Sequence, residues 1–308
     1  MTWELALAGL GIGTLVGFTG MGGGSLLAPL LVLVFGFNPT VAIGTDILHG
    51  AVFKSVGALR HRAIGTVHAR LSGWMIVTSA PMSLVGVALA TWLDRHTDSH
   101  EIGTTVLGIA LLVGSLGLLG KSIVRSREHP AGNFAMTRRD RIAALIIGFF
   151  GGLIVGLTSV GTGVFFGLTM LIVFPLRSAK VVGTDIFHAA ALLWVAGLGH
   201  LVAGNVRLDV VAWLLIGSIP GVLLGSQLTI KIPDRSLRAL LATLLAVVGI
   251  KLADVPSAEI LQVIAFAAGL GVFAWTVIGN RSLRAQPTSA QEEATGDSLA
   301  IDVPGRLS

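Results

Sequence analysis

A carboxylate and an imidazole, three residues apart, occur twice in this chain. The stretch Gly44 to His49 reads GTDILH, and Gly183 to His188 reads GTDIFH. Residues three apart share one face of a helix, and a carboxylate beside an imidazole can exchange a proton near neutral pH, which suits proton coupling. Two alternatives stay open, namely a helix-capping role for the acid and a divalent-metal site built from both pairs. The residues concerned are Asp46, His49, Asp185 and His188.

A lysine follows the first acid on the same predicted helix. Lys54 lies eight residues beyond Asp46, on about the same face, and Leu193 stands at the corresponding place in the second copy. It could pair with Asp46, attract substrate charge, or extend to the membrane interface near Arg60. Charged groups in spanning segments are unfavourable unless paired or solvated, so they point to function. We assign proton coupling or gating to Asp46, His49, Lys54, Asp185 and His188.

Glycine-rich breaks interrupt the apolar sequence at Thr19 to Ser25 and at Thr158 to Gly163. Non-helical backbone at membrane depth survives where it lines a cavity, and a helix that begins near Ser25 or Val164 would direct backbone N–H groups at an anion. Close helix packing is the alternative explanation for these glycines. The predicted substrate-binding residues are Thr19, Gly22, Gly23, Gly24, Ser25, Thr45, Thr158, Ser159, Gly161, Thr162, Gly163 and Thr184.

Composition places these residues in an integral membrane protein. Of the 308 residues, 53% are hydrophobic and only 12% are charged, too few to cover a soluble globule of this size. Apolar runs such as 71–93 and 102–123 have about the length that crosses a bilayer as helix, and they do not alternate like the strands of an outer-membrane barrel. The net charge of +5 comes from basic residues in short loops, which indicates topology rather than nucleic-acid binding. We expect no removable signal.

The chain is an internal duplication. Gly44 and Gly183 are 139 positions apart, and the same offset pairs Trp74 with Trp213 and Pro81 with Pro220. Basic loops of one half correspond to poorly charged loops of the other, which predicts two inverted-topology repeats in an all-α membrane protein with eight or nine transmembrane helices. The predicted divisions are repeats at 1–123 and 142–279, a basic cytoplasmic linker at 124–141 and a disordered tail at 280–308.

The motifs resemble a known family. The run from Thr19 to Leu31, followed by Ala42-Ile43-Gly44-Thr45 and repeated in weaker form after Gly156, resembles the TauE/SafE sulfite exporter and permease family over residues 5–278. The second half departs from that pattern, because Thr162 interrupts its glycines and Leu168 replaces the proline. The acids of the GTD motifs also differ from most relatives. The matching positions are Gly22, Gly23, Gly24, Pro29, Gly44, Thr45, Gly161, Gly163, Gly183 and Thr184.

The resemblance implies a multi-pass transporter of the prokaryotic plasma (inner) membrane that carries a small anion, typically sulfite or an organosulfur compound, coupled to an ion gradient. It does not fix the substrate. We expect no enzyme activity, no cofactor, no resident metal and no nucleic-acid partner; the partners are the anionic substrate and the lipid bilayer, and a homo-oligomer is compatible with the sequence. A divalent transition-metal transporter that uses the twin Asp/His pairs is the alternative, and a membrane enzyme is disfavoured because no nucleophile and base pair stands out.

Overall fold

A computed structural model describes residues 2–19, 26–96, 99–123, 134–228, 234–254, 257–269 and 271. All regular structure in these segments is helical. The helices are α1 (Thr2–Thr19), α2 (Leu27–Leu33), α3 (Pro39–Ala63), α4 (Ala69–His96), α5 (Ser99–Ile123), α6 (Arg138–Thr158), α7 (Phe165–Val173), α8 (Ser178–Val202), α9 (Leu208–Leu228) and α10 (Asp234–Leu252), and a further apolar helix covers Ala258–Gly269. Most of the first Gly-rich break, part of the linker and the predicted tail lie outside the described residues.

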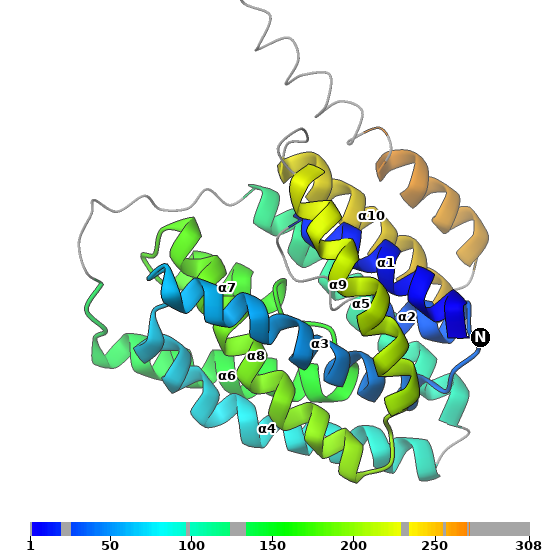
Figure 1. The fold of residues 1–308 in the computed structure, drawn as a ribbon, viewed down its shortest axis with the longest axis horizontal. Helices are drawn as coiled ribbons and strands as arrows, with labels where there is room; N and C mark the ends of the chain where they lie inside the picture. Colours follow the sequence, from blue (N-terminus) through cyan, green and yellow to red (C-terminus); the bar gives the residue numbers. More distant parts are fainter. Residues whose placement is uncertain are drawn as a thin grey trace, which may run out of the picture.

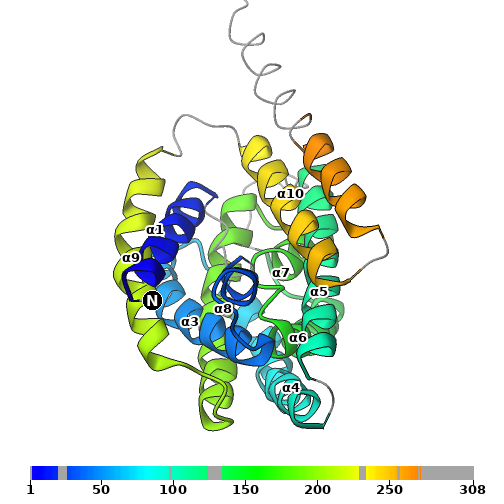
Figure 2. The same cartoon turned by 90° about the vertical axis from the view of Figure 1, so that its right-hand side faces the viewer.

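The helices associate in pairs that join the two halves of the chain. Helix α1 packs on α9, α4 on α6, α3 on α8 and α5 on α10 (Figure 1). In the perpendicular view, α1 and α9 lie on one side, α5 and α10 on the other, and α3, α7 and α8 lie between them (Figure 2). Helices α3 and α8 are antiparallel, because Gly197 of α8 faces Leu48 of α3, whereas Gly57 of α3 faces Ile186 of α8.

Close contacts recur when the two halves are exchanged. At several positions a glycine lies so near the backbone of a neighbouring helix or loop that a Cβ atom would overlap it. The contacts below form pairs in which the equivalent residues are 139 positions apart. Small residues let membrane helices approach in this way. These reciprocal contacts join Gly9 to Leu214 and Gly148 to Met75, Gly13 to Ser218 and Gly152 to Ser79, and Gly44 to Asn205 and Gly183 to Thr66.

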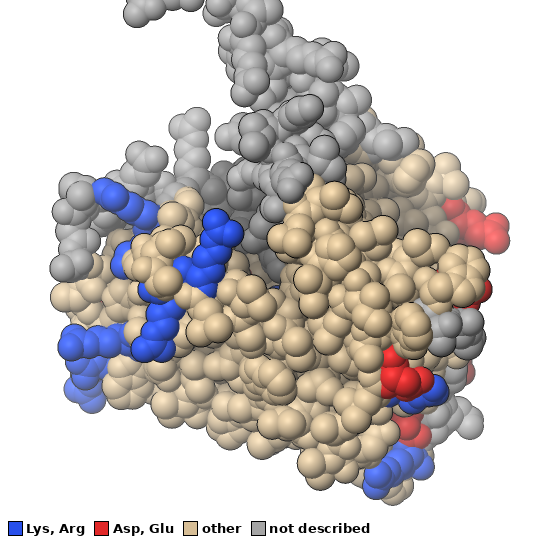
Figure 3. Space-filling view, viewed as in Figure 1, with Lys and Arg blue, Asp and Glu red and all other residues tan. Residues whose placement is uncertain are grey.

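The surface has a wide uncharged belt between two charged ends. Figure 3 shows Lys and Arg gathered over the end where α3 ends and α4 and α6 begin, and acidic groups mainly at the opposite end. Exposed basic residues stand at the end of α3 and at the starts of α4, α6 and α8, and they are Arg60, Arg62, Arg70, Arg138, Arg139, Arg141 and Arg177.

Five of the described helices, α4, α5, α6, α8 and α9, are long and apolar enough to cross a membrane. The expected eight or nine spans are therefore not confirmed. Helix α3 is long enough at 25 residues, but the acid, histidines and basic residues along it make it too polar to qualify. Helix α2 has only 7 residues and α7 only 9, so each is too short to cross a bilayer.

The helix starts differ from the sequence-based boundaries where polar caps intervene. Helix α6 begins at Arg138 rather than at 142, because Thr137 and Asp140 form a reciprocal capping box. Helix α3 begins at Pro39, and the Asn38 side chain accepts hydrogen bonds from the N–H groups of Thr40 and Val41. The capping role considered for the acid of the first GTD motif is thus wrong, because Asn38 holds that position.

Two glycines of α1 give a matched test of the packing. Adding a methyl group at Gly13 would overlap the Ser218 carbonyl of α9, whereas a Cβ at Gly11 meets no atom within 4 Å. Alanine raises helix propensity at both positions by about 1 kcal/mol, and overpacking costs about 1–3 kcal/mol. We expect Gly13→Ala to lower the unfolding temperature in detergent and Gly11→Ala to leave it unchanged or raise it. Equal effects would contradict the close approach of α1 to α9.

Candidate functional site

The second Gly-rich break is a tight turn that lies against the middle of α3. Ser159 ends α6 with a φ of 61°, and Gly161 and Gly163 have φ values of 138° and 87°, a region that side chains with a Cβ rarely adopt. The turn presents two hydroxyl groups to α3. Ser159 Oγ donates to Asp46 Oδ2 at 2.7 Å, and Thr162 Oγ1 accepts from Lys54 Nζ at 2.7 Å. A break in one half therefore binds the charged helix of the other half.

Lys54 is buried between the two halves. Its residue is only 5% exposed, and its ammonium interacts electrostatically with the carboxylates of both Asp46 and Asp185. A buried ammonium needs such partners, because its transfer from water is otherwise strongly unfavourable. Of the three roles considered from the sequence, extension to the membrane interface is excluded. Among side chains that the structure describes, Lys54 is the one buried Lys or Arg.

Each predicted histidine turns to a serine on a neighbouring helix rather than to the acid three residues before it. His49 Nε2 lies 2.9 Å from Ser218 Oγ of α9, and His188 Nε2 lies 3.0 Å from Ser79 Oγ of α4. The two contacts are exact counterparts at the offset of 139 positions. The direct proton exchange within each Asp/His pair that the spacing suggested is not present in this conformation.

The threonine hydroxyls of the GTD motifs accept hydrogen bonds from backbone N–H groups of two loops. Thr45 Oγ1 accepts from the Arg207 N–H at 3.2 Å, and Thr184 Oγ1 accepts from the His68 N–H at 2.9 Å. These contacts are also counterparts 139 positions apart. Both hydroxyls were predicted to bind substrate, but in this conformation they fasten the start of α9 and of α4 to the central helices.

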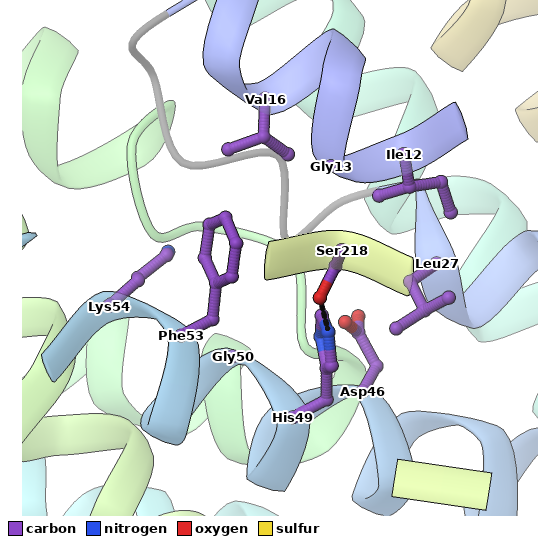
Figure 4. Close-up of a pocket in the computed structure, with 10 residues that line it drawn as sticks. All are labelled: Ile12, Gly13, Val16, Leu27, Asp46, His49, Gly50, Phe53, Lys54 and Ser218. Atoms are coloured by element: carbon purple, nitrogen blue, oxygen red, sulfur yellow. Dashed lines mark hydrogen bonds between the residues drawn. The ribbon is translucent and has the colours of Figure 1, made fainter. Parts of the chain in front are cut away.

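A small cavity adjoins the acid and histidine of the first half (Figure 4). Its volume of about 20 Å³ is room for one or two water molecules. Figure 4 shows the His49 ring bonded to Ser218, with the Asp46 carboxylate beside it and Phe53 and Lys54 further along α3. Apolar side chains from α1 and α2 close the opposite wall. The lining residues are Ile12, Gly13, Val16, Leu27, Asp46, His49, Gly50, Phe53, Lys54 and Ser218.

The other predicted binding residues divide between the two breaks. Thr158, Ser159 and Thr162 are buried in the second break, and Thr158 Oγ1 accepts from the Val160 N–H at 3.2 Å. The Gly161 carbonyl accepts from the first two N–H groups of α7, which are therefore not directed at a ligand. Thr19 ends α1, while the remaining predicted residues of the first break lie outside the described residues, and these are Gly22, Gly23, Gly24 and Ser25.

The acids and histidines of the two GTD motifs do not form one metal-binding cluster. No group of three His, Asp or Glu side chains in the described segments could hold a metal ion, so the twin pairs do not converge as the divalent-metal alternative requires. His200, the counterpart of His61, is buried near the end of α8, where Nε2 donates to the Gly156 carbonyl at 2.9 Å. Its Nδ1 lies 3.4 Å from Asn205 Nδ2.

Sequence reasoning missed the two serines. Ser79 and Ser218 stand inside apolar helices that carry no motif. The repeat offset could have revealed them, because they are a matched polar pair at corresponding positions of the two halves.

Comparisons with known proteins bear on the class of protein. The family model described as sulfite exporter TauE/SafE matches residues 5–252. The chain belongs to the TauE/SafE family. It is 34% identical over 254 residues to "Probable membrane transporter protein YjnA" of Bacillus subtilis, an alignment that covers 82% of this chain and 100% of that protein.

More distant relatives carry similar names. "Probable membrane transporter protein YdhB" of Bacillus subtilis is 24% identical, over 78% of this chain and 96% of the relative. "Probable membrane transporter protein MJ0441" of Methanocaldococcus jannaschii is also 24% identical, over 80% and 93%. No solved structure matches the chain. This TauE/SafE protein is therefore a multi-pass membrane transporter, not an enzyme.

The contact between Lys54 and the second break can be tested by stability. Thr162→Val keeps the shape of the side chain but removes the acceptor for the Lys54 ammonium. A hydrogen bond to a charged group contributes about 1.5–3 kcal/mol, so we expect a clear fall in the unfolding temperature. Thr169→Val is the control, because Thr169 Oγ1 bonds only to carbonyls of its own helix. A loss as large in the control would contradict the assignment.

Proposed function

We propose that this TauE/SafE protein is a proton-coupled secondary transporter of a small oxyanion, sulfite or a small organosulfur compound, in a prokaryotic plasma membrane. The observation that carries the proposal is the buried ammonium of Lys54, which lies between the two halves, donates to the Thr162 hydroxyl and interacts with two carboxylates. The family description supplies the sulfur chemistry. The substrate site lies where the second break meets the centre of α3.

The proposed architecture is an inverted repeat. Helices α3 and α8 are equivalent at the offset of 139 positions and antiparallel. A two-fold operation that exchanges two antiparallel helices has its axis perpendicular to them. If both helices cross the bilayer, that axis lies in the membrane plane, which is the arrangement of many secondary transporters with a site at mid-depth.

An anion fits the central site if the carboxylates are protonated when it binds. Lys54 supplies one positive charge, whereas Asp46 and Asp185 together supply two negative charges when ionised. Addition of an anion to that set would leave excess negative charge in a medium of low dielectric constant, which is strongly unfavourable. Proton uptake by a carboxylate offsets the charge of the substrate. This linkage is the physical basis of the proposed coupling.

Removal of the ammonium tests the sign of the substrate. We expect Lys54→Met to reduce sulfite uptake into proteoliposomes by at least about 100-fold, since one lost charge-assisted contact in a buried site is worth ~3 kcal/mol. Lys251→Met, at an exposed position, should transport normally. A divalent-cation transporter would respond in the opposite way, because loss of a buried positive charge strengthens cation binding. Zinc or cobalt flux that persists or rises in Lys54→Met would refute the anion proposal.

Proton coupling and substrate binding can be separated at Asp46. The amide oxygen of Asp46→Asn can still accept the hydrogen bond from Ser159, but the amide cannot take up a proton. We expect sulfite exchange between equal concentrations to continue in this variant, while an imposed pH gradient no longer drives accumulation. Accumulation at the wild-type level in Asp46→Asn would show that this carboxylate carries no coupled proton.

A further inference from the structure

The cavity beside Asp46 and His49 has a counterpart that is filled. At the offset of 139 positions, Gly13, Val16, Asp46, His49 and Ser218 of the cavity correspond to Gly152, Val155, Asp185, His188 and Ser79. An equivalent histidine–serine hydrogen bond is present at both places, at 2.9 Å in the first half and 3.0 Å in the second. Two matching sets of polar groups therefore exist, although only the first borders the cavity in Figure 4.

An aromatic ring covers the histidine of the second half. Phe166 of α7 is fully buried, and its ring centroid lies 4.4 Å from that of His188. On its other side the ring packs directly on Gly151, where a Cβ atom would overlap it. The counterpart of Phe166 is the smaller Leu27, which lines the cavity of the first half. The counterpart of Gly151 is Ile12, so the ring occupies space that the Leu27 and Ile12 side chains occupy in the first half.

The equivalent place in the second half contains a buried polar atom without a hydrogen-bond partner among the described residues. His188 is 0% exposed, and its Nδ1 has no hydrogen-bond partner among the described residues. A buried polar atom without a partner is unfavourable by about 1–3 kcal/mol. Such a group is expected where a ligand or water supplies the partner in another state. Phe166 at present covers this histidine.

We propose that Asp185, His188 and Ser79 form a second half-site for the same oxyanion, closed here by Phe166 and opened when the first half-site closes. This inference rests on the proposed function for its ligand, but its geometry rests on the reciprocal contacts alone. The two half-sites face opposite ends of the molecule, since the operation that relates them reverses α3 and α8. Movement of the Phe166 ring away from His188 is the local step that opens the second one.

The absence of cysteine from the sequence allows a direct test. Val16→Cys places a thiol in the open cavity, and Val155→Cys places one at the matched position of the filled half-site. A membrane-impermeant methanethiosulfonate reagent is applied to either face of oriented vesicles. Ile64→Cys and Val202→Cys, exposed at opposite ends of the protein, calibrate the two faces. We expect Val16→Cys to react from one face and Val155→Cys, more slowly, from the other.

Replacement of the ring should shift this pattern. Phe166→Leu copies the residue that lines the open cavity, so it should raise the labelling rate of Val155→Cys by about tenfold, equivalent to ~1.4 kcal/mol in the opening equilibrium. It should lower the rate of Val16→Cys in the same protein background. The pair Ser218→Cys and Ser79→Cys repeats the measurement at independent positions, in case either valine variant fails to fold.

The outcomes separate the half-site from its ligand. Labelling of both thiols from the same face would overturn the second half-site. It would also be overturned if Val16→Cys reacted while Val155→Cys stayed unlabelled even in the Phe166→Leu background. Labelling from opposite faces, with sulfite slowing both reactions, supports the whole inference. Opposite faces with no effect of sulfite on either thiol would keep the second half-site and overturn only the proposed substrate.

Discussion

A positive charge buried between two halves of a membrane protein constrains everything around it. The Lys54 ammonium lies where water cannot solvate it, so protein groups must replace the lost hydration. A hydroxyl of the second break provides one contact, and a carboxylate from each half provides the electrostatic balance. The turn at residues 159–164 must leave the helical path to bring its hydroxyls to α3, and the left-handed backbone of that turn follows from this requirement.

The close glycine contacts explain how the rest of the molecule can hold this centre. Helices α1 and α9 in one pair, and α4 and α6 in another, approach until backbone meets backbone. Shape complementarity of this kind leaves little freedom within a pair. Polar contacts between α3 or α8 and these pairs run through single side chains, such as the histidine–serine hydrogen bonds. Rearrangement is therefore easier between the pairs and the central helices than inside a pair.

Much of this arrangement could be predicted because the chain is an internal duplication, so that its two halves can be aligned with each other. The repeated GTD motif and the matching offset located the acids, the histidines and the two breaks, and continuous apolar runs identified the class of protein. Contacts set by three-dimensional packing could not be predicted. Asn38 rather than Asp46 caps α3, the histidines turn to serines on other helices, and the GTD threonines bind loop N–H groups. Periodicity shows which face a side chain lies on but not which helix covers that face.

The replacement of Lys54 by Leu193 in the second half has an energetic consequence. If the halves were identical in sequence, exchanging their conformations would give a state of the same free energy, and neither would predominate. The halves differ at many positions, and the lysine adds a difference in charge, because exchange of conformations carries its ammonium to a different place relative to Thr162 and to the two acids. The resting protein must then prefer one orientation even without a gradient. Residues that differ between the halves of a duplicated transporter can thus make one of its two conformations more stable than the other.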